Sequence, residues 1–238
     1  MATPMTPARR HGVEILDGPD VAPALRHRSL ADVARANTLF GGTRAVLREL
    51  EPVFAAHRGA RMTLLDAGTG AADIPCAARV LASRHGVRLT LIGVDAAAPL
   101  VAAAASRLDE ALCADVRALP LESGSVDVVV CSQLLHHFPE HRIAEVLREL
   151  HRVARERVIV SDLVRSWLAA AGIWLASFPL RFHPVSRHDG VVSVLRGFTA
   201  AELRDHVVQA TGVRPMVTRY AGWRVTASWP PARAAAPA

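Results

Sequence analysis

The stretch that most constrains the fold of this chain runs from Met62 to Asp73, with the sequence MTLLDAGTGAAD. A short apolar run ends in Asp66, a glycine loop with Gly68 and Gly70 follows at once, and the residues from Ile74 onward favour a helix. A strand, a tight glycine turn and a helix start let backbone N–H groups approach a ligand closely. Because a carboxylate before the glycines would repel a pyrophosphate, Asp66 favours a ligand with a positively charged group.

Two further acidic residues follow in order along the chain. Leu89 to Asp95 form a second apolar run that ends in an acid, and a carboxylate at a strand end can accept from both hydroxyls of a ribose. Asp115 can accept a hydrogen bond from an adenine amino group, while the backbone N–H of Val116 donates to a ring nitrogen. This order of acids predicts a nucleoside-containing ligand.

A third apolar run, Val126 to Cys131, leads into Ser132, Gln133 and the pair His136-His137. The whole series resembles the class I S-adenosylmethionine-dependent methyltransferases, over residues 60–162. The resemblance implies S-adenosylmethionine as cofactor and S-adenosylhomocysteine as product. It also implies a set of cofactor-binding positions, which are Asp66, Gly68, Thr69, Gly70, Asp73, Asp95, Ala96, Asp115, Val116, Ser132 and Gln133.

The sequence departs from the pattern of this family at two places. Ala72 stands where the family often has a third glycine, and alanine is small enough for a close helix–strand contact, so we expect little cost. Residues 152–157 run straight into the next apolar segment without a Pro-Gly-Gly turn. We expect the second departure to change local geometry and to leave the fold intact.

The alternation of apolar runs and helical patterns predicts an α/β fold. We expect a Rossmann-like, doubly wound, mostly parallel seven-stranded sheet with a C-terminal antiparallel hairpin and an N-terminal helical cap. The chain of 238 residues is long enough for one such domain. The expected segments are a disordered N-terminus (1–22), a helical cap (23–60), a cofactor-binding core (61–162), an apolar lid or substrate segment (163–198), a C-terminal helix and hairpin that complete the core (199–229), and a disordered tail (230–238).

Composition excludes several classes of protein. The three cysteines have no paired spacing, which argues against a disulfide scaffold and a zinc site and fits a cytoplasmic location. No apolar core follows the N-terminus, so we expect no signal peptide. The formal charge is +6 and all 28 basic residues are arginine. Because these arginines are spread along the chain and only one tyrosine is present, we do not expect nucleic-acid binding.

Residues 167–180 form an apolar segment that is too short to span a bilayer. It is a candidate for a lid over an apolar substrate, with a core helix and a membrane-facing surface as alternatives. Trp167 and Trp174 share a helix face and Phe178 lies four residues further on, so we expect these aromatic side chains to contact an aromatic or lipid-like acceptor, together with His183. His183 and His188 lie in a stretch, residues 183–190, for which the polar composition predicts a turn-rich connection.

His136 and His137 are the candidate catalytic bases, because they follow the fourth strand, where the transferred methyl group should emerge. A neutral imidazole there could take a proton from a phenol or an enol. The sequence does not distinguish between the two histidines, and it predicts no metal site.

These features predict methyl transfer to a small apolar or aromatic acceptor, of the kind that bacterial polyketide- and quinone-pathway methyltransferases use, with oxygen favoured over carbon. A non-catalytic S-adenosylmethionine-binding regulator or partner subunit is one alternative. A nicotinamide-dependent oxidoreductase is the other, although Asp66 would be badly placed in such an enzyme. The oligomeric state, monomer or homodimer, stays open.

Overall fold

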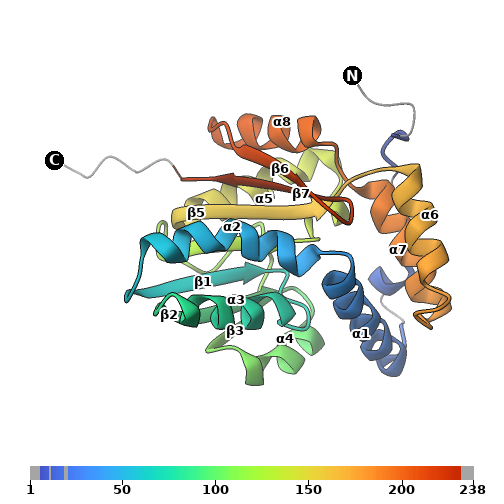
Figure 1. Cartoon of the computed structure of the whole chain (residues 1–238), viewed down its shortest axis with the longest axis horizontal. Helices are drawn as coiled ribbons and strands as arrows, with labels where there is room; N and C mark the ends of the chain where they lie inside the picture. Colours follow the sequence, from blue (N-terminus) through green and yellow to red (C-terminus); the bar gives the residue numbers. More distant parts are fainter. Residues whose placement is uncertain (1–5, 11, 19–20, 232–238) are drawn as a thin grey trace.

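The computed structural model describes residues 6–10, 12–18 and 21–231. A seven-stranded sheet lies at its centre, in the order β3-β2-β1-β4-β5-β7-β6 (Figure 1). β1 to β5 pair in parallel, whereas β7 is antiparallel to both β5 and β6. The predicted fold is confirmed, including the closing hairpin. The strands are β1 Arg61–Ala67, β2 Arg88–Asp95, β3 Glu110–Cys113, β4 Val126–Ser132, β5 Ala154–Leu163, β6 Met216–Tyr220 and β7 Arg224–Trp229.

Helices cover both faces of the sheet, because the central strands are apolar on both sides. Along β4, Val128 and Val130 pack with α2 (Gly42–Ala56) and α3 (Asp73–Arg84). Val129 and Cys131 pack on the opposite face, with α5 (Glu140–Val153) and α8 (Ala200–Thr211). The short helix α4 (Ala98–Ala104) contacts β2 and β3.

Three helices gather beyond the carboxyl ends of the parallel strands, on the right of Figure 1. They are α1 (Pro23–Leu39), α6 (Trp167–Ala176) and α7 (Pro184–Arg196). Only the first half of the predicted cap therefore lies over the strand ends, since α2 belongs to the layer that covers the sheet. Short 3₁₀ turns complete the fold at η1 (Ile15–Asp17), η2 (Ala105–Arg107) and η3 (Leu135–His137).

A capping box stands at the start of α8. The Thr199 side chain accepts from the Glu202 backbone N–H, and the Glu202 carboxylate accepts from the Thr199 N–H. Gly212 ends the same helix with a φ of 72°, a left-handed conformation that favours glycine. The local sequence therefore fixes both ends of this helix.

The structure differs from the sequence-based prediction in two segments. Residues 183–190 were expected to be a turn-rich connection, but they begin helix α7, where Pro184 takes the first helical position and the His183 side chain accepts from the Val185 N–H. The described residues before α1 make specific contacts with the rest of the protein, where disorder was expected. For example, Glu14 is buried, and the Arg10 N–H donates to the Leu195 carbonyl. The expected disordered tail lies, from residue 232, outside the described residues.

Candidate functional site

The glycine loop between β1 and α3 is held against the end of β2. The N–H groups of Gly68 and Thr69 donate to the Val94 carbonyl at 2.8 and 2.9 Å, and the Gly70 N–H donates to Asp95 Oδ2 at 3.1 Å. Gly68 has a φ of +78°, and a Cβ there would lie 3.0 Å from the Leu134 side chain. Glycine is therefore required at this position by both conformation and space.

Ala72 contradicts the expectation that the missing third glycine costs little. The residue is fully buried and has a φ of +56°, in the left-handed region. An L-residue pays about 1–2 kcal/mol for that conformation, whatever the size of its side chain. The alanine that replaces the family's third glycine therefore strains the backbone next to the glycine loop.

Two carboxylates line a cavity of about 110 Å³ above the glycine loop. Burial, together with the nearby charges of Asp73 and Asp95, raises the pKa of Asp66 to about 7, against the opposing effect of a hydrogen bond from Thr69. Burial also raises the pKa of Asp73, whose Oδ2 has no hydrogen-bond partner among the described residues; Ser132 Oγ has none either. Two crowded acids, one of them with an unpartnered oxygen, complement positively charged groups such as the ammonium and sulfonium of S-adenosylmethionine.

The predicted ribose and adenine positions lie outside this cavity, along the neighbouring strand ends. Asp95 uses one oxygen for the Gly70 N–H and the other for the Ala97 N–H, and it retains free lone pairs for a ligand. Ala96, directly after it, is exposed. Val116 is buried, whereas Asp115 is exposed and hydrogen-bonded to the Arg117 guanidinium, which lowers the pKa of the Asp115 carboxyl.

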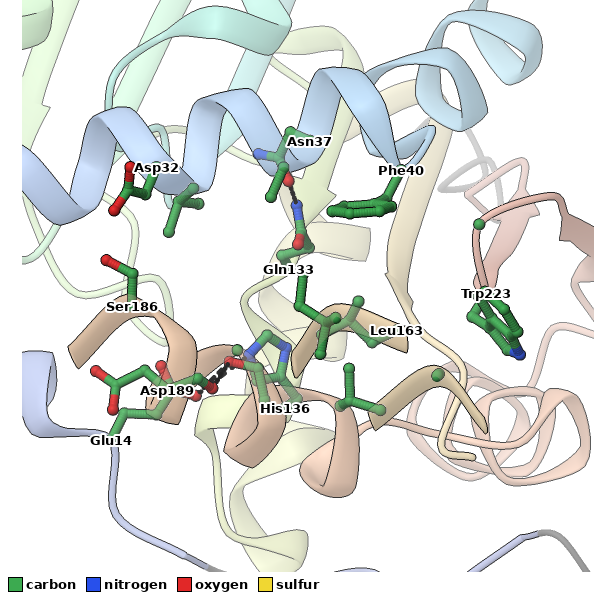
Figure 2. A pocket seen from close by; sticks show the side chains of 18 of the residues that line it. Glu14, Asp32, Asn37, Phe40, Gln133, His136, Leu163, Ser186, Asp189 and Trp223 are labelled. Atoms are coloured by element: carbon green, nitrogen blue, oxygen red, sulfur yellow. Dashed lines mark hydrogen bonds and ion pairs between the residues drawn. The ribbon is translucent and has the colours of Figure 1, made fainter. Parts of the chain in front are cut away.

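A second, larger cavity of about 370 Å³ lies beside the first, among α1, η3, α6, α7 and the hairpin turn. Three residues, Val33, Asn37 and Gln133, line both cavities. Asn37 accepts a hydrogen bond from Gln133 across the boundary, and Figure 2 shows the two side chains meeting between α1 and the end of β4. The walls of the larger cavity are mostly apolar and include Phe40 and Leu163. The two cavities are placed to bring two ligands into contact.

His136 projects into the larger cavity from the side opposite α1 (Figure 2). Its Nδ1 lies 2.7 Å from Oδ1 of Asp162, a fully buried residue at the end of β5. Burial alone would raise the pKa of Asp162, but the His136 imidazole beside it brings the pKa below its usual value. Because the ionised carboxylate can only accept, Nδ1 bears a proton, and in the neutral tautomer that this contact selects the lone pair lies on Nε2.

Nε2 of His136 is buried and has no hydrogen-bond partner among the described residues. The nearest acid is Glu14, whose Oε1 lies 3.7 Å from it. Glu14 is itself buried and accepts from Ser193 at 2.8 Å and from Arg196 at 3.1 Å. The His137 ring stacks against His136 with centroids 4.3 Å apart, and it is more exposed. His136 is thus the histidine with a positioned, unused nitrogen in the cavity.

Within the described part of the chain, one group of three side chains could hold a metal ion, namely Glu14, His136 and His137. Their ligand atoms all lie within 4.8 Å of one another. The guanidinium of Arg196 contacts the same Glu14 oxygen and would oppose a divalent cation there. The donor chemistry therefore favours a hydrogen-bonded network over a metal site.

The structure does not place the predicted aromatic residues on the acceptor cavity. Trp167, Trp174 and Phe178 are 42%, 47% and 48% exposed, on the outer face of α6 and just beyond its end. The inner face of α6 supplies Ala169, Gly172 and Ile173 instead. His183 also lies off the cavity, because its ring caps α7. The spacing of the aromatic residues on one face was correct, but that face points away from the sheet.

Several site residues escaped the sequence-based prediction. The sequence analysis places Asp162 only as the last residue of the core (61–162), Asn37 only within the helical cap (23–60), and Glu14 within the N-terminus expected to be disordered (1–22). The available signal for Glu14 was the apolar run around it, Val13, Ile15 and Leu16, in an otherwise polar stretch. The only signal for Asp162 was its position at the end of an apolar strand, the same place that Asp66 and Asp95 hold in theirs.

Comparison with known proteins agrees with this geometry. Residues 65–160 match the family model described as a methyltransferase domain. No curated protein sequence matches the chain. Among solved structures, a SAM-dependent methyltransferase from Aquifex aeolicus is 19% identical, with a TM-score of 0.57, and the match covers 80% of this chain and 89% of that one. Magnesium protoporphyrin IX methyltransferase from Synechocystis PCC 6803, solved with bound SAM, is 14% identical, with a TM-score of 0.54 and coverages of 92% and 89%.

Residues 65–160 match a methyltransferase domain, and the whole described chain has the fold of the solved methyltransferases compared above. More particularly, the chain carries a class I methyltransferase domain, the class that uses S-adenosylmethionine, as its sequence predicted.

Proposed function

We propose that this protein transfers a methyl group from S-adenosylmethionine to an apolar small molecule in the larger cavity, with oxygen as the favoured acceptor atom. The observation that supports this most strongly is the unpartnered Nε2 of His136, which is buried in the mostly apolar cavity beside the glycine loop. A base at that place has one evident use, which is to remove a proton from an acceptor held there.

On the cofactor side, Asp66 and Asp73 accept from the ammonium group of the methionine moiety. Asp95 accepts from the ribose hydroxyls with the lone pairs that Gly70 and Ala97 leave free. Asp115 and Val116 hold the adenine, with Ala96 beside the ribose. When bound, S-adenosylmethionine supplies an electrophilic methyl group and leaves as S-adenosylhomocysteine.

On the acceptor side, the apolar walls hold a phenol-like or enol-like molecule and exclude water. His136 Nε2 takes the hydroxyl proton, and Asp162 orients the imidazole and stabilises the cation that forms. Gln133 and Asn37 lie at the boundary of the two cavities, where they align the acceptor oxygen with the methyl group.

The test is a methyl-transfer assay on a panel of phenolic acceptors, with the product identified by mass spectrometry. His136→Ala should lower kcat about 10²–10⁴-fold, the usual contribution of a general base, with little change in S-adenosylhomocysteine affinity. Asp162→Asn should lower kcat and shift its pH profile, because the amide can no longer fix the tautomer. His137→Ala should cost less, since His137 is the more exposed ring.

The matched control is His141→Ala, which removes an exposed histidine from the start of α5. Full activity of the His136→Ala enzyme would contradict the role of the base. A product methylated at carbon would contradict the preference for oxygen. Tight S-adenosylhomocysteine binding without turnover on any acceptor would favour the non-catalytic alternative.

A further inference from the structure

The outer face of α6 is apolar along its whole length. The exposed positions between residues 167 and 178 are spaced as one helix face and are Trp167, Leu168, Ala171, Trp174, Leu175 and Phe178. We call these six residues the α6 face. A helix on the surface of a globular protein normally presents polar side chains to water, and a contiguous exposed apolar patch marks an interaction surface.

Arginines border the α6 face. The Arg10 guanidinium lies 5.1 Å from the centre of the Trp167 ring, and that of Arg187 lies 3.8 Å from the centre of the Phe178 ring. Arg181 is exposed just beyond the end of the helix. The only acid between residues 165 and 196 is Asp189, which is buried and bound to backbone N–H groups. The apolar face therefore has a cationic border.

This combination favours an anionic lipid surface over a second copy of the chain. A symmetric contact between two α6 faces would bring arginine borders together without acids to pair them. Tryptophan and phenylalanine suit the boundary between headgroups and acyl chains, and arginines beside them can reach the phosphates. Among the described residues no helix has the length and apolar character needed to cross a bilayer, so α6 would lie in the plane of the surface.

We propose that the α6 face docks the protein on anionic phospholipid bilayers. This inference goes beyond methyl transfer and does not depend on it. The inner face of the same helix, with Ala169, Gly172 and Ile173, lines the larger cavity. In the docked protein, only helix α6 would separate the larger cavity from the acyl chains of the bilayer. Apolar molecules concentrate among those acyl chains.

The test is co-sedimentation of the full-length protein with phosphatidylcholine vesicles that contain about a third of phosphatidylglycerol. The double variant Leu168→Glu, Leu175→Glu should lose binding by about tenfold or more, because it places two carboxylates on the face. Val80→Glu is the matched control, since Val80 is an equally exposed apolar residue (56%, against 55% for Leu168) on α3, away from the α6 face. Arg181→Gln should weaken binding to the anionic vesicles, and neutral vesicles should bind the wild type less.

Calorimetry with S-adenosylhomocysteine on the α6 and Arg181 variants separates this proposal from the proposed function, because these substitutions are far in sequence from the glycine loop and lie on other elements. The docking proposal is overturned if the wild type does not sediment with anionic vesicles, or if Val80→Glu loses as much binding as the double variant. It is also overturned if light scattering shows a dimer that the double variant converts to monomer, which would assign the face to a second copy.

Discussion

At the scale of single residues, Asp66 couples ligand binding to pH. Its pKa of about 7 lies well above the usual value of 3.8, because burial disfavours the charged form. Between about pH 4 and 7, the ligand-free folded protein therefore carries a proton on Asp66 that the unfolded chain has already released. Asp66 therefore contributes its full share of the folding stability below about pH 4, and this contribution is lost as the pH rises through about 7.

The ammonium group of S-adenosylhomocysteine pairs with the ionised form of Asp66, so the affinity for this ligand should rise between about pH 6 and 8. Below the pKa of Asp66, the gain in affinity should approach about tenfold per pH unit, because ligand binding must release the proton from Asp66. Calorimetry across this range measures it. Asp66→Asn should bind weakly with a flat pH dependence, and at about pH 8 it should unfold at higher denaturant concentration than the ligand-free wild type. A pH-independent affinity of the wild type would contradict this account.

The sequence predicts the site residues that belong to the strand–loop–helix motif around the glycine loop. Asp66, Gly68 and Gly70 sit in one continuous strand–loop–helix stretch, and their roles follow from that stretch alone. Glu14, His136 and Asp162 come from three distant segments, and only the fold places His136 2.7 Å from Asp162. Nothing in their spacing distinguishes His136 from His137, since the choice depends on which ring faces the buried carboxylate.

At the scale of elements, α7 holds the N-terminal segment in place. Asp189 is buried in α7 and accepts from the N–H groups of Ile15 and Leu16 at 2.9 and 3.0 Å. Arg9 donates to the Arg196 carbonyl at 2.8 Å, near the end of the same helix. These bonds position Glu14 at the wall of the acceptor cavity.

Asp189→Ala should therefore destabilise the protein by about 1–3 kcal/mol, the cost of leaving buried donors without a partner. Urea unfolding measures this loss. The variant should also bind acceptor less well while its affinity for S-adenosylhomocysteine changes little, because Asp189 lines the larger cavity and not the one above the glycine loop. Asp205→Ala, at an exposed acid on α8, is the control. Equal stability of the two variants would show that the N-terminal segment adds nothing to the fold.

Elements with strong local signals were predicted closely. The glycine loop leads directly into helix α3, as predicted, and the predicted closing hairpin forms from β6 and β7. The helix α7 was missed because histidines, Asp189 and Gly190 gave its first turns a polar composition. Its buried polar residues find partners only in the folded protein, where Ser186 donates to Ser29 and Asp189 binds the N-terminal segment. Tertiary contacts thus overrode the local preference.

At the scale of the whole molecule, the strand order explains why the site forms at all. The strand order changes direction between the neighbouring strands β1 and β4, and the carboxyl ends of these two strands supply Asp66 and Ser132 to one cavity. A parallel sheet opens its ligand crevice at such a switch point. The helices α1, α6 and α7 then close the acceptor cavity beyond it, which is an arrangement that no single segment of the sequence encodes.

The central claim is that this crevice holds S-adenosylmethionine, and calorimetric titration with S-adenosylhomocysteine tests it most directly. The account predicts a dissociation constant on the order of micromolar for the wild type at about pH 8, a loss of about tenfold or more in Asp95→Ala, and no binding of NAD. Asp95→Ala must retain its folded far-UV spectrum for the comparison to hold. Absence of S-adenosylhomocysteine binding by folded wild-type protein, or binding of NAD in its place, would contradict the account.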